Sequence, residues 1–272
     1  MTSFFKRFSE KPLKGKLIAK TLVYIVSRKR PSTGGEVELS VVVPVFNEED
    51  SIGSLLDRMI NVLRDTVANC EVIVVDDGST DRTPEVVEEK GKAWHIRIIR
   101  HRFNKGYGEA LKTGLRASRG RCVLIMDGDG SYDPSQIPRL YSAIRANDYD
   151  MVIGWRTYVA GAEEPYRTVA KKFLNLLASL LFKEHVKDVN SGMRVFKREA
   201  ILSILDELPS KFSFTTTATL LFLKKKLKIA YTPISYHRRK GKSKMKFVRD
   251  GLKILLTILC IAFFGKGLRL SS

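Results

Sequence analysis

The stretch LSVVVPVFNEEDSIGSLLDRMINVLRD, residues 39–65, sets the pattern from which the fold can be derived. Its first part, LSVVVPVF (39–46), is a short apolar run rich in β-branched residues, which is typical of a strand buried on both faces. The remainder has apolar residues at helical spacing and acidic residues in its first turn. The stretch therefore predicts a β-strand that is followed directly by an amphipathic helix.

The same alternation of strand and helix continues along the chain. Further buried strands are predicted at CEVIVVDDGS (70–79), HIRIIRH (95–101), RCVLIMDGD (121–129) and YDMVIGWR (149–156). Such an order gives an α/β fold with a Rossmann-like, doubly wound, mostly parallel sheet, in which ligands bind outside the carboxyl ends of the strands. The polar residues expected to meet at that edge are Asn47, Glu48, Asp76, Asp77, Asn104, Lys105, Asp127, Asp129 and Arg156.

The 272-residue chain has a net charge of +19, and this charge is concentrated at its two ends. Residues 1–35 contain nine Lys or Arg and one acid, and residues 224–272 contain fourteen and one. We expect three parts: a basic amphipathic arm and linker at 1–35, a globular domain at 36–235, and a basic loop with an apolar helix at 236–272. The three scattered cysteines have no metal-site spacing and are expected to be reduced.

Each basic end also carries an apolar run, LIAKTLVYIV (17–26) and LKILLTILCIAFF (252–264). Both are shorter than the roughly 20 residues that span a bilayer, and the first does not suit a signal peptide because it has an internal lysine and no small-residue cleavage site. Apolar runs flanked by Lys and Arg are typical of helices that lie in a membrane interface, although packing on the domain is an alternative. We expect a peripheral protein at the cytoplasmic face of a membrane, in contact with anionic lipid. No aromatic-interleaved basic stripe indicates a nucleic-acid partner, and the oligomeric state stays open.

The segment VLIMDGDGSYDP (123–134) places two carboxylates, Asp127 and Asp129, directly after a buried strand. A calcium loop of the EF-hand type is excluded, because Tyr132 and Pro138 stand where it needs glycine and glutamate. A dinucleotide fingerprint at Gly106 is incomplete and lies in the wrong strand–helix unit. An acidic turn that merely ends a strand is one alternative. A divalent metal that bridges a diphosphate explains the pair best, with glycines on either side of Asp129 to let substrate approach the backbone.

Five motifs in order resemble the family 2 glycosyltransferases of GT-A fold, and among them the dolichol-phosphate mannose and glucose synthases. They are VVVPVFNEE (41–49), VVDDGSTD (74–81), NKGYGEALKTG (104–114), MDGDGSYDP (126–134) and DVNSGMRVF (188–196). The resemblance implies a nucleotide-sugar donor, a polyprenyl or dolichyl phosphate acceptor, and Mg²⁺ or Mn²⁺ held by Asp127 and Asp129.

The resemblance also implies roles for residues throughout the predicted site. Catalytic roles fall to Asp127, Asp129, Asp188 and Arg194. The donor would be bound by Pro44, Phe46, Asn47, Glu48, Asp76 or Asp77, Lys105, Gly106 and the segment Asp127, Gly128 and Asp129. Donor or acceptor phosphate would meet Arg156, Arg167, Ser191, Arg239, Ser243 and Lys244. The alternatives are purely structural roles: DDGSTD would only cap a helix, through Ser79 or Asp81, and Arg194 would only pair with Asp188.

Two departures from the family pattern bear on the chemistry. Ser131 stands where many mannose synthases have glutamine, which leaves the donor sugar open. No Asp or Glu occurs between Leu208 and Arg249, where relatives with hydroxyl acceptors usually have a base. A phosphate acceptor needs cations rather than a base, so we expect an inverting, metal-dependent transfer of sugar from a GDP-mannose or UDP-glucose type donor to a lipid phosphate. The alternative is a family 2 enzyme that acts on a hydroxyl in polysaccharide or glycolipid synthesis.

Overall fold

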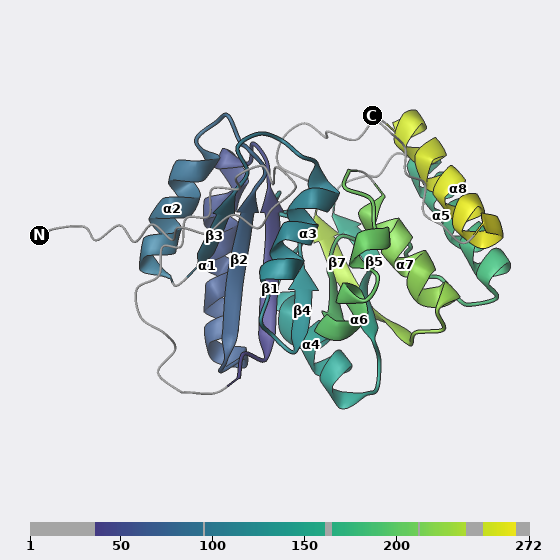
Figure 1. Ribbon diagram of the computed structural model, residues 1–272, viewed down its shortest axis with the longest axis horizontal. Helices are drawn as coiled ribbons and strands as arrows, with labels where there is room; N and C mark the ends of the chain where they lie inside the picture. The colour runs from purple at the N-terminus through teal and green to yellow at the C-terminus, as the bar shows by residue number, and fades with distance from the viewer. Residues whose placement is uncertain (1–35, 95, 161–164, 212, 238–246, 265–272) are drawn as a thin grey trace, which may run out of the picture.

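The computed structural model describes residues 36–94, 96–160, 165–211, 213–237 and 247–264, and their elements surround one sheet (Figure 1). In chain order the elements are β1 (Leu39–Val45), α1 (Glu49–Thr66), β2 (Cys70–Asp76), α2 (Thr83–Ala93), β3 (Arg97–Arg100), α3 (Tyr107–Ala117), β4 (Cys122–Ile125), η1 (Pro134–Gln136), α4 (Ile137–Ala146), β5 (Met151–Ala160), α5 (Pro165–Phe182), β6 (Arg194–Lys197), α6 (Arg198–Leu202), η2 (Leu205–Glu207), α7 (Phe214–Lys224), β7 (Ile229–His237) and α8 (Phe247–Phe264). The N-terminal arm predicted at 1–35 lies outside the described residues.

The sheet has seven strands in the order β3-β2-β1-β4-β6-β5-β7, and only β6 runs antiparallel to its neighbours. β1 lies inside the sheet between β2 and β4, where Val41 pairs with Val72 on one side and with Leu124 on the other. All five predicted strands are present, which confirms the doubly wound, mostly parallel sheet. β2 ends at Asp76 and β4 at Ile125, so both strands are shorter than predicted, and β6 and β7 were not predicted.

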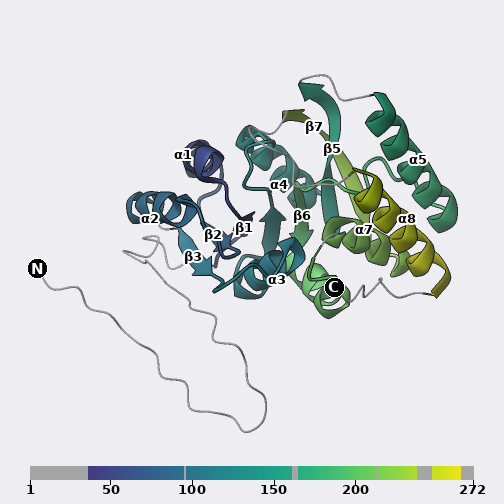
Figure 2. The same cartoon turned by 90° about the horizontal axis from the view of Figure 1, so that it is seen from above.

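Helices cover both faces of this sheet, as the alternation of buried side chains requires (Figure 2). Val41 and Val43 point into the layer of α1, α2 and α4, whereas Val42 points into the layer of α3, α6 and α7. Every residue of β1 is buried, as a strand covered on both faces should be. The apolar run at 39–46 is therefore continuous because β1 is covered by helices on both faces.

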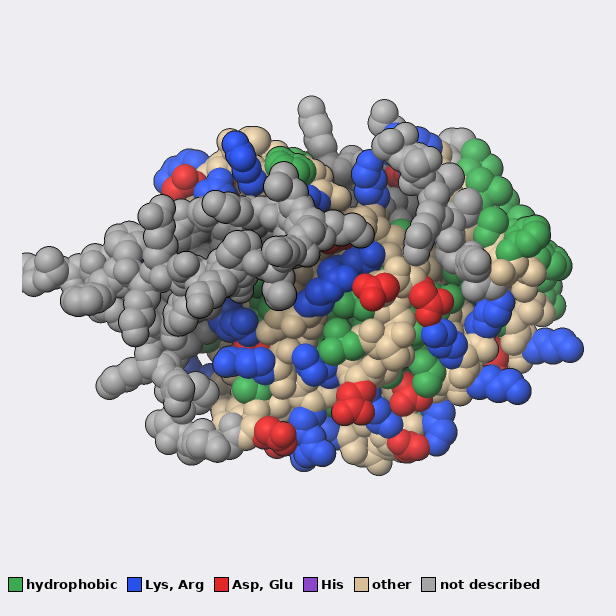
Figure 3. All heavy atoms as spheres, in the orientation of Figure 1, with side chains coloured by type: hydrophobic (Ala, Val, Ile, Leu, Met, Phe, Trp, Pro, Cys, Tyr) green, Lys and Arg blue, Asp and Glu red, His purple; other side chains and the backbone are tan. Residues whose placement is uncertain are grey.

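Helices α5 and α8 lie side by side at the β7 end of the sheet, where α8 also packs on α7 (Figures 1 and 2). One face of α8 is buried through Ile254, Ile258 and Ile261. The opposite faces of both helices expose large apolar side chains, and Figure 3 shows apolar side chains gathered at this end of the molecule. Within the described parts of the chain, the structure has no helix of the length and apolarity that crossing a membrane demands.

The amino ends of the central strands are joined by the buried carboxylate of Glu71. Its Oε1 accepts hydrogen bonds from Ser40 Oγ at 2.7 Å and Arg119 N at 2.8 Å. Its Oε2 accepts from Arg97 Nη1 at 2.8 Å and Arg119 Nη2 at 2.9 Å. Burial alone would raise the pKa of Glu71, but these donors outweigh it and lower the pKa below its ordinary value of 4.5.

We predict that Glu71→Gln lowers the free energy of unfolding most at neutral pH. The lowered pKa of Glu71 stabilises the folded state above the ordinary value of 4.5, and this stabilisation is lost as the pH falls through the folded-state pKa. The difference between wild type and variant should therefore shrink as pH falls from neutral into this acidic range, measured by urea unfolding at each pH. The exposed Glu89→Gln is the control, and an equally pH-dependent difference there would contradict the assignment.

Candidate active site

The ends of β1, β2 and β4 bring the predicted donor residues to one edge of the sheet. Val45 pairs with Asp76 at the end of β1 and β2, and Val42 pairs with Ile125 at the end of β4. The chain segments that follow these strands therefore start beside one another. This is the edge at which ligands of doubly wound sheets bind.

Asp127 and Asp129 are each held by a neighbouring hydroxyl group. Tyr107 Oη donates to Asp127 Oδ1 at 2.7 Å, and Ser131 Oγ donates to Asp129 Oδ1 at 2.5 Å. Ser131 N also donates to that oxygen at 3.0 Å. Ser131 therefore orients the second carboxylate from the position where the family pattern has glutamine.

The two carboxylates concentrate negative charge in a place that is only partly open to solvent. Burial first, and then the negative charge of Asp129, raise the pKa of Asp127 to about 6. The hydrogen bond from Tyr107 and the positive charges of Arg156 and Arg194 oppose this rise. A cation placed between the carboxylates would relieve their repulsion.

This donor set fits a divalent metal that shares its ligands with a substrate. Mg²⁺ is often bound through one or two carboxylates, with phosphate oxygens and waters completing its shell. Within the described residues, no group of three or more His, Cys, Asp or Glu forms a complete metal cage. Asp127 and Asp129 could supply two ligands of a divalent metal, and phosphate oxygens and waters would have to supply the others.

Close contacts with neighbouring side chains explain two of the glycines around this pair. A Cβ at Gly128 would lie 2.5 Å from Val45 Cγ1, so packing against β1 requires glycine here. The substrate approach expected from sequence stays a prediction. A Cβ at Gly192 would overlap the carboxylate of Asp127. The loop before β6 thus rests directly against the predicted metal ligand.

The predicted donor residues after β1 interlock with the motif after β2. Asn47, at a positive φ of 51°, receives the Thr80 N–H on its Oδ1 at 2.8 Å. Glu48 N donates to Thr83 Oγ1 at 2.7 Å, and Ser51 Oγ donates to the buried Glu48 carboxylate at 3.2 Å. Pro44 is buried within β1, and Phe46 is half-buried beside it. Asp81 accepts the N–H of Thr83, the first residue of α2, at 2.9 Å. This contact agrees in part with the alternative that DDGSTD caps a helix.

The structure distinguishes Asp76 from Asp77, which the sequence left as alternatives. Asp77 accepts the N–H groups of Lys105 and Gly106 at 2.9 and 2.8 Å. Asp76 Oδ1 accepts Ser79 N, but among the described residues its buried Oδ2 meets no hydrogen-bond donor. Arg100 Nε lies 3.0 Å from that oxygen as an ion pair, off the axis of a hydrogen bond. Asp76 is therefore the better candidate for a ligand contact.

The glycines of the NKGYG segment have a structural reason that excludes a dinucleotide fingerprint. The N–H groups of Gly108 and Glu109, in the first turn of α3, donate to Lys211 O at 3.2 Å and Ser210 O at 2.6 Å. A Cβ at Gly106 would lie 2.9 Å from Ser210 O, and one at Gly108 would overlap Pro209 O. The helix N-terminus that would cradle a pyrophosphate is thus capped by another segment of this chain.

At the predicted acceptor end, Asp188 forms a buried ion pair with Arg156. Arg156 Nε and Nη2 donate to the two carboxylate oxygens at 2.8 Å each, and Lys171 Nζ lies 3.8 Å from Oδ2. Burial would raise the pKa of Asp188, but Arg156 and Lys171 outweigh it and lower the pKa to about 2. Arg156 also lies over the ring of Tyr236, with 5.3 Å between the guanidinium carbon and the ring centroid.

Arg194 does not pair with Asp188, contrary to the simpler alternative from sequence. Its side chain is completely buried, and burial lowers its pKa to about 10. Its donors go to Ser191 O, to Thr215 O at 3.0 Å and to Thr219 Oγ1 at 2.8 Å. Arg194 therefore joins the loop that carries Ser191 to helix α7, and a catalytic role for it stays a prediction.

Several site residues fall outside this description or were not predicted. The side chain of Arg167, and Arg239, Ser243 and Lys244, lie outside the described residues. Sequence reasoning missed Tyr107, although it stands between the two glycines of a quoted motif. It also missed Tyr132, whose Oη receives the Gly192 N–H at 2.6 Å. No local pattern marks such hydroxyl groups, because their partners are distant in sequence.

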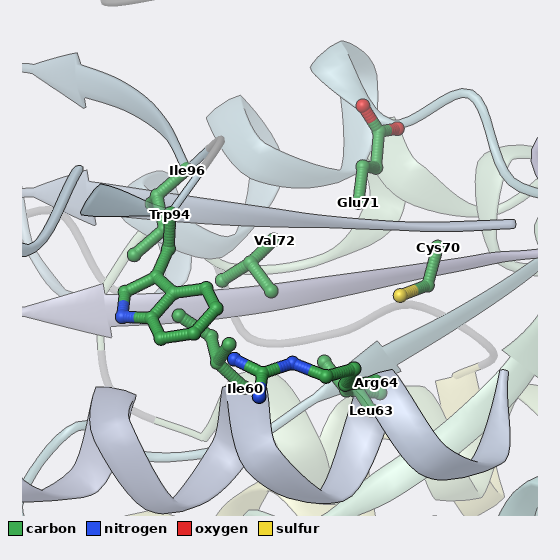
Figure 4. A pocket seen from close by; sticks show the side chains of 8 residues that line it. All are labelled: Ile60, Leu63, Arg64, Cys70, Glu71, Val72, Trp94 and Ile96. Carbon is green, nitrogen blue, oxygen red and sulfur yellow. The ribbon is translucent and has the colours of Figure 1, made fainter. Parts of the chain in front are cut away.

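A surface pocket lies at the amino ends of the strands, between α1 and the start of β2 (Figure 4). Its wall includes Trp94, and the Arg64 guanidinium carbon lies 4.4 Å from the Trp94 ring centroid. Cys70 and Val72 line it from the first half of β2, whereas Asp76 ends that strand. The pocket is therefore remote from the carboxylates described above.

Comparison with known proteins agrees with this geometry. Residues 40–205 match the family described as glycosyl transferase family 2. The low-salt glycan biosynthesis hexosyltransferase of Haloferax volcanii is 33% identical over 217 residues, which are 78% of this chain and 51% of that protein. This chain therefore spans about half the length of that relative. A dolichyl-phosphate beta-glucosyltransferase of Trichomonas vaginalis is 30% identical over 249 residues, which are 86% of this chain and 73% of that protein.

The fold is also found in solved structures. Glucosyl-3-phosphoglycerate synthase of Mycobacterium tuberculosis, crystallised with Mn²⁺, UDP and phosphoglyceric acid, superposes with a TM-score of 0.65 at 23% identity. The match covers 84% of this chain and 78% of the mycobacterial one. This likeness confirms the predicted GT-A fold.

We predict that Gly192→Ala weakens binding of Mn²⁺ about tenfold, as is usual when the groups that orient a metal ligand are disturbed. The new Cβ would displace the end of the Asp127 side chain, so the melting temperature should change little. Gly251→Ala in α8 is the matched control, because nothing lies within 4 Å of its new Cβ. Equal Mn²⁺ affinities of the two variants, measured by electron paramagnetic resonance, would contradict the prediction.

Proposed function

We propose that this chain, which belongs to glycosyl transferase family 2, transfers a sugar from a nucleotide-sugar donor to a polyprenyl or dolichyl phosphate. The donor would be of the GDP-mannose or UDP-glucose type. Mg²⁺ or Mn²⁺ would be bound by Asp127 and Asp129 together with the donor diphosphate. The Trichomonas relative, which is named for a dolichyl-phosphate acceptor, supports the class of acceptor.

The observation that carries the proposal is the ion pair between Asp188 and Arg156. A hydroxyl acceptor needs a carboxylate or another base that can take its proton. Asp188 is unsuited to this task, because two cations hold its pKa near 2 and its oxygens are occupied by Arg156. What this end of the site presents is positive charge, which suits a phosphate acceptor.

The reaction would be a direct displacement at the anomeric carbon. A phosphate oxygen of the lipid attacks that carbon, and the bond to the diphosphate oxygen breaks with inversion of configuration. The bonding electron pair leaves with the nucleoside diphosphate, and no proton has to be removed from a phosphate that is already ionised. When bound, the metal offsets the charge that grows on the leaving diphosphate.

The residues of this chain contribute mainly by positioning and by electrostatics. Asp188 fixes the guanidinium of Arg156 through a bidentate contact, which uses two of its five N–H donors. Arg156 is close enough to Asp127 for its charge to lower the pKa of that carboxylate. It therefore lies between the predicted metal site and the acceptor end, where it would offset the repulsion between two phosphorylated substrates.

We further propose that α5 and α8 lie on the cytoplasmic surface of a membrane and bring the site to its lipid substrate. Exposed apolar residues recur on α5 at helical spacing, and α8 adds others beside them. They are Tyr166, Val169, Phe173, Leu176, Leu180, Leu252, Leu256, Phe263 and Phe264. Helix α5 exposes Lys172 and contains no acid, and Asp250 of α8 is buried. An apolar face flanked by basic residues suits an anionic lipid surface.

We predict that the wild-type protein moves labelled sugar into organic solvent when it is given a short polyprenyl phosphate, Mn²⁺ or Mg²⁺, and a panel of UDP- and GDP-sugars. Asp129→Asn should lower the rate at least about a hundredfold, because one of two metal carboxylates loses its charge. Asp133→Asn is the matched control, since that carboxylate caps η1 four residues further on.

Transfer to a hydroxyl acceptor instead of the lipid phosphate would contradict the proposed acceptor but not the family. Equal activity of Asp129→Asn and wild type would contradict the metal site. A folded protein that transfers no sugar from any donor to any acceptor would overturn the enzymatic proposal itself.

We predict that the protein sediments with vesicles that contain anionic lipid and less with neutral vesicles. Replacing Val169, Phe173 and Leu180 together by serine should abolish most of this binding, because these side chains supply apolar contact area. Phe103→Ser is the matched control: this side chain is 59% exposed but lies after β3, away from α5 and α8. Unchanged sedimentation of the triple variant would place the membrane contact elsewhere.

A further inference from the structure

Asp77 and His101 form a buried pair beneath the predicted donor site. Asp77 Oδ1 lies 2.6 Å from His101 Nδ1, and His101 Nε2 lies 3.0 Å from Thr113 Oγ1. The side chain of His101 is completely buried. An ionised carboxylate only accepts hydrogen bonds, so Nδ1 must carry a proton, and in a neutral ring Nε2 then accepts the hydroxyl of Thr113.

The same carboxylate holds the loop that precedes α3. Asp77 accepts the N–H groups of Lys105 and Gly106, and Gly106 has a φ of 103°, which other residues rarely adopt. These two residues were predicted to lie over the nucleotide. Asp77 therefore fixes the backbone of this loop.

The loop continues directly into the residue that orients the first metal carboxylate. Tyr107 follows Gly106 and begins α3, and its Oη donates to Asp127 Oδ1 at 2.7 Å. A continuous chain of contacts thus runs from His101 through Asp77 and the 105–106 backbone to Tyr107 and Asp127. A shift of the loop would move both the predicted nucleotide contact and the hydroxyl on the metal ligand.

We infer that His101 is a positioning residue for the bound nucleoside diphosphate and its metal. It acts by holding the Asp77 carboxylate in the one orientation that accepts both loop N–H groups. The inference rests on the proposed function only in that a metal and a nucleoside diphosphate bind at Asp127 and Asp129. It assigns a role to a buried side chain that contacts neither of them.

The test compares two nearly isosteric variants, His101→Asn and His101→Leu. The asparagine amide can donate to Asp77 from nearly the place of Nδ1, whereas leucine cannot donate at all. Titration calorimetry would measure binding of UDP and of GDP in the presence of Mn²⁺, and electron paramagnetic resonance would measure binding of Mn²⁺ alone. Melting temperatures report the structural cost of each change.

We expect His101→Leu to weaken Mn²⁺-dependent binding of the nucleoside diphosphate about tenfold, the size of one hydrogen bond to a charged group. His101→Asn should stay within about twofold of wild type, because its donor keeps Asp77 in place. Combined with Tyr107→Phe, the leucine change should cost less than the sum of the two single changes, since both act through the same loop.

Other outcomes would overturn the inference. Unchanged binding in His101→Leu would show that the loop does not need the histidine. Equal weakening in both variants, in proportion to their loss of melting temperature, would show a purely structural residue. If the wild-type protein bound neither nucleotide nor Mn²⁺, both the proposed function and the inference would fail. If the wild-type protein binds both, failure of the His101 variants to behave as expected contradicts only the inference.

Discussion

Two carboxylates one residue apart, Asp127 and Asp129, repel each other at the end of a buried strand, and much of the surrounding structure compensates for that repulsion. Tyr107 and Ser131 each donate a hydroxyl hydrogen bond to one of them. The charges of Arg156 and Arg194 oppose the rise in the pKa of Asp127. These groups come from β5, β6 and α3 and from the turn itself, so several elements contribute to stabilising the pair.

Buried carboxylates have different surroundings at the amino ends and at the carboxyl ends of the strands. At the amino ends, the Glu71 carboxylate is enclosed by hydrogen-bond donors from Ser40, Arg97 and Arg119, which leaves it suited only to holding strands together. At the carboxyl ends, Asp76 retains a buried oxygen without a hydrogen-bond donor among the described residues. A buried oxygen without a hydrogen-bond donor is costly in a folded protein, so this Asp76 oxygen is a candidate for a ligand contact.

The sequence predicted those features that depend on local pattern. Apolar runs predicted the strands β1 to β5, and the two acids that end the run at 121–129 gave the predicted metal pair. It did not predict β6, a four-residue strand, or β7, which contains Pro233 and alternates in burial. Nor could it assign Arg156 to Asp188, or explain Gly106 by the carbonyl of Ser210, because these partners are brought together only by the folded chain.

The contacts around Gly106 also connect the donor and acceptor halves of the site. The segment at 209–211 caps the N-terminus of α3 and then leads into α7, whose Thr215 and Thr219 receive the buried guanidinium of Arg194. Arg194 in turn holds Ser191, and the adjacent Gly192 rests against Asp127. A displacement of the loop at 105–106 would therefore be transmitted through packed backbone to the predicted acceptor side. Positioning of this kind would serve the proposed transfer of a sugar to a lipid phosphate, in which no proton transfer would help to lower the barrier.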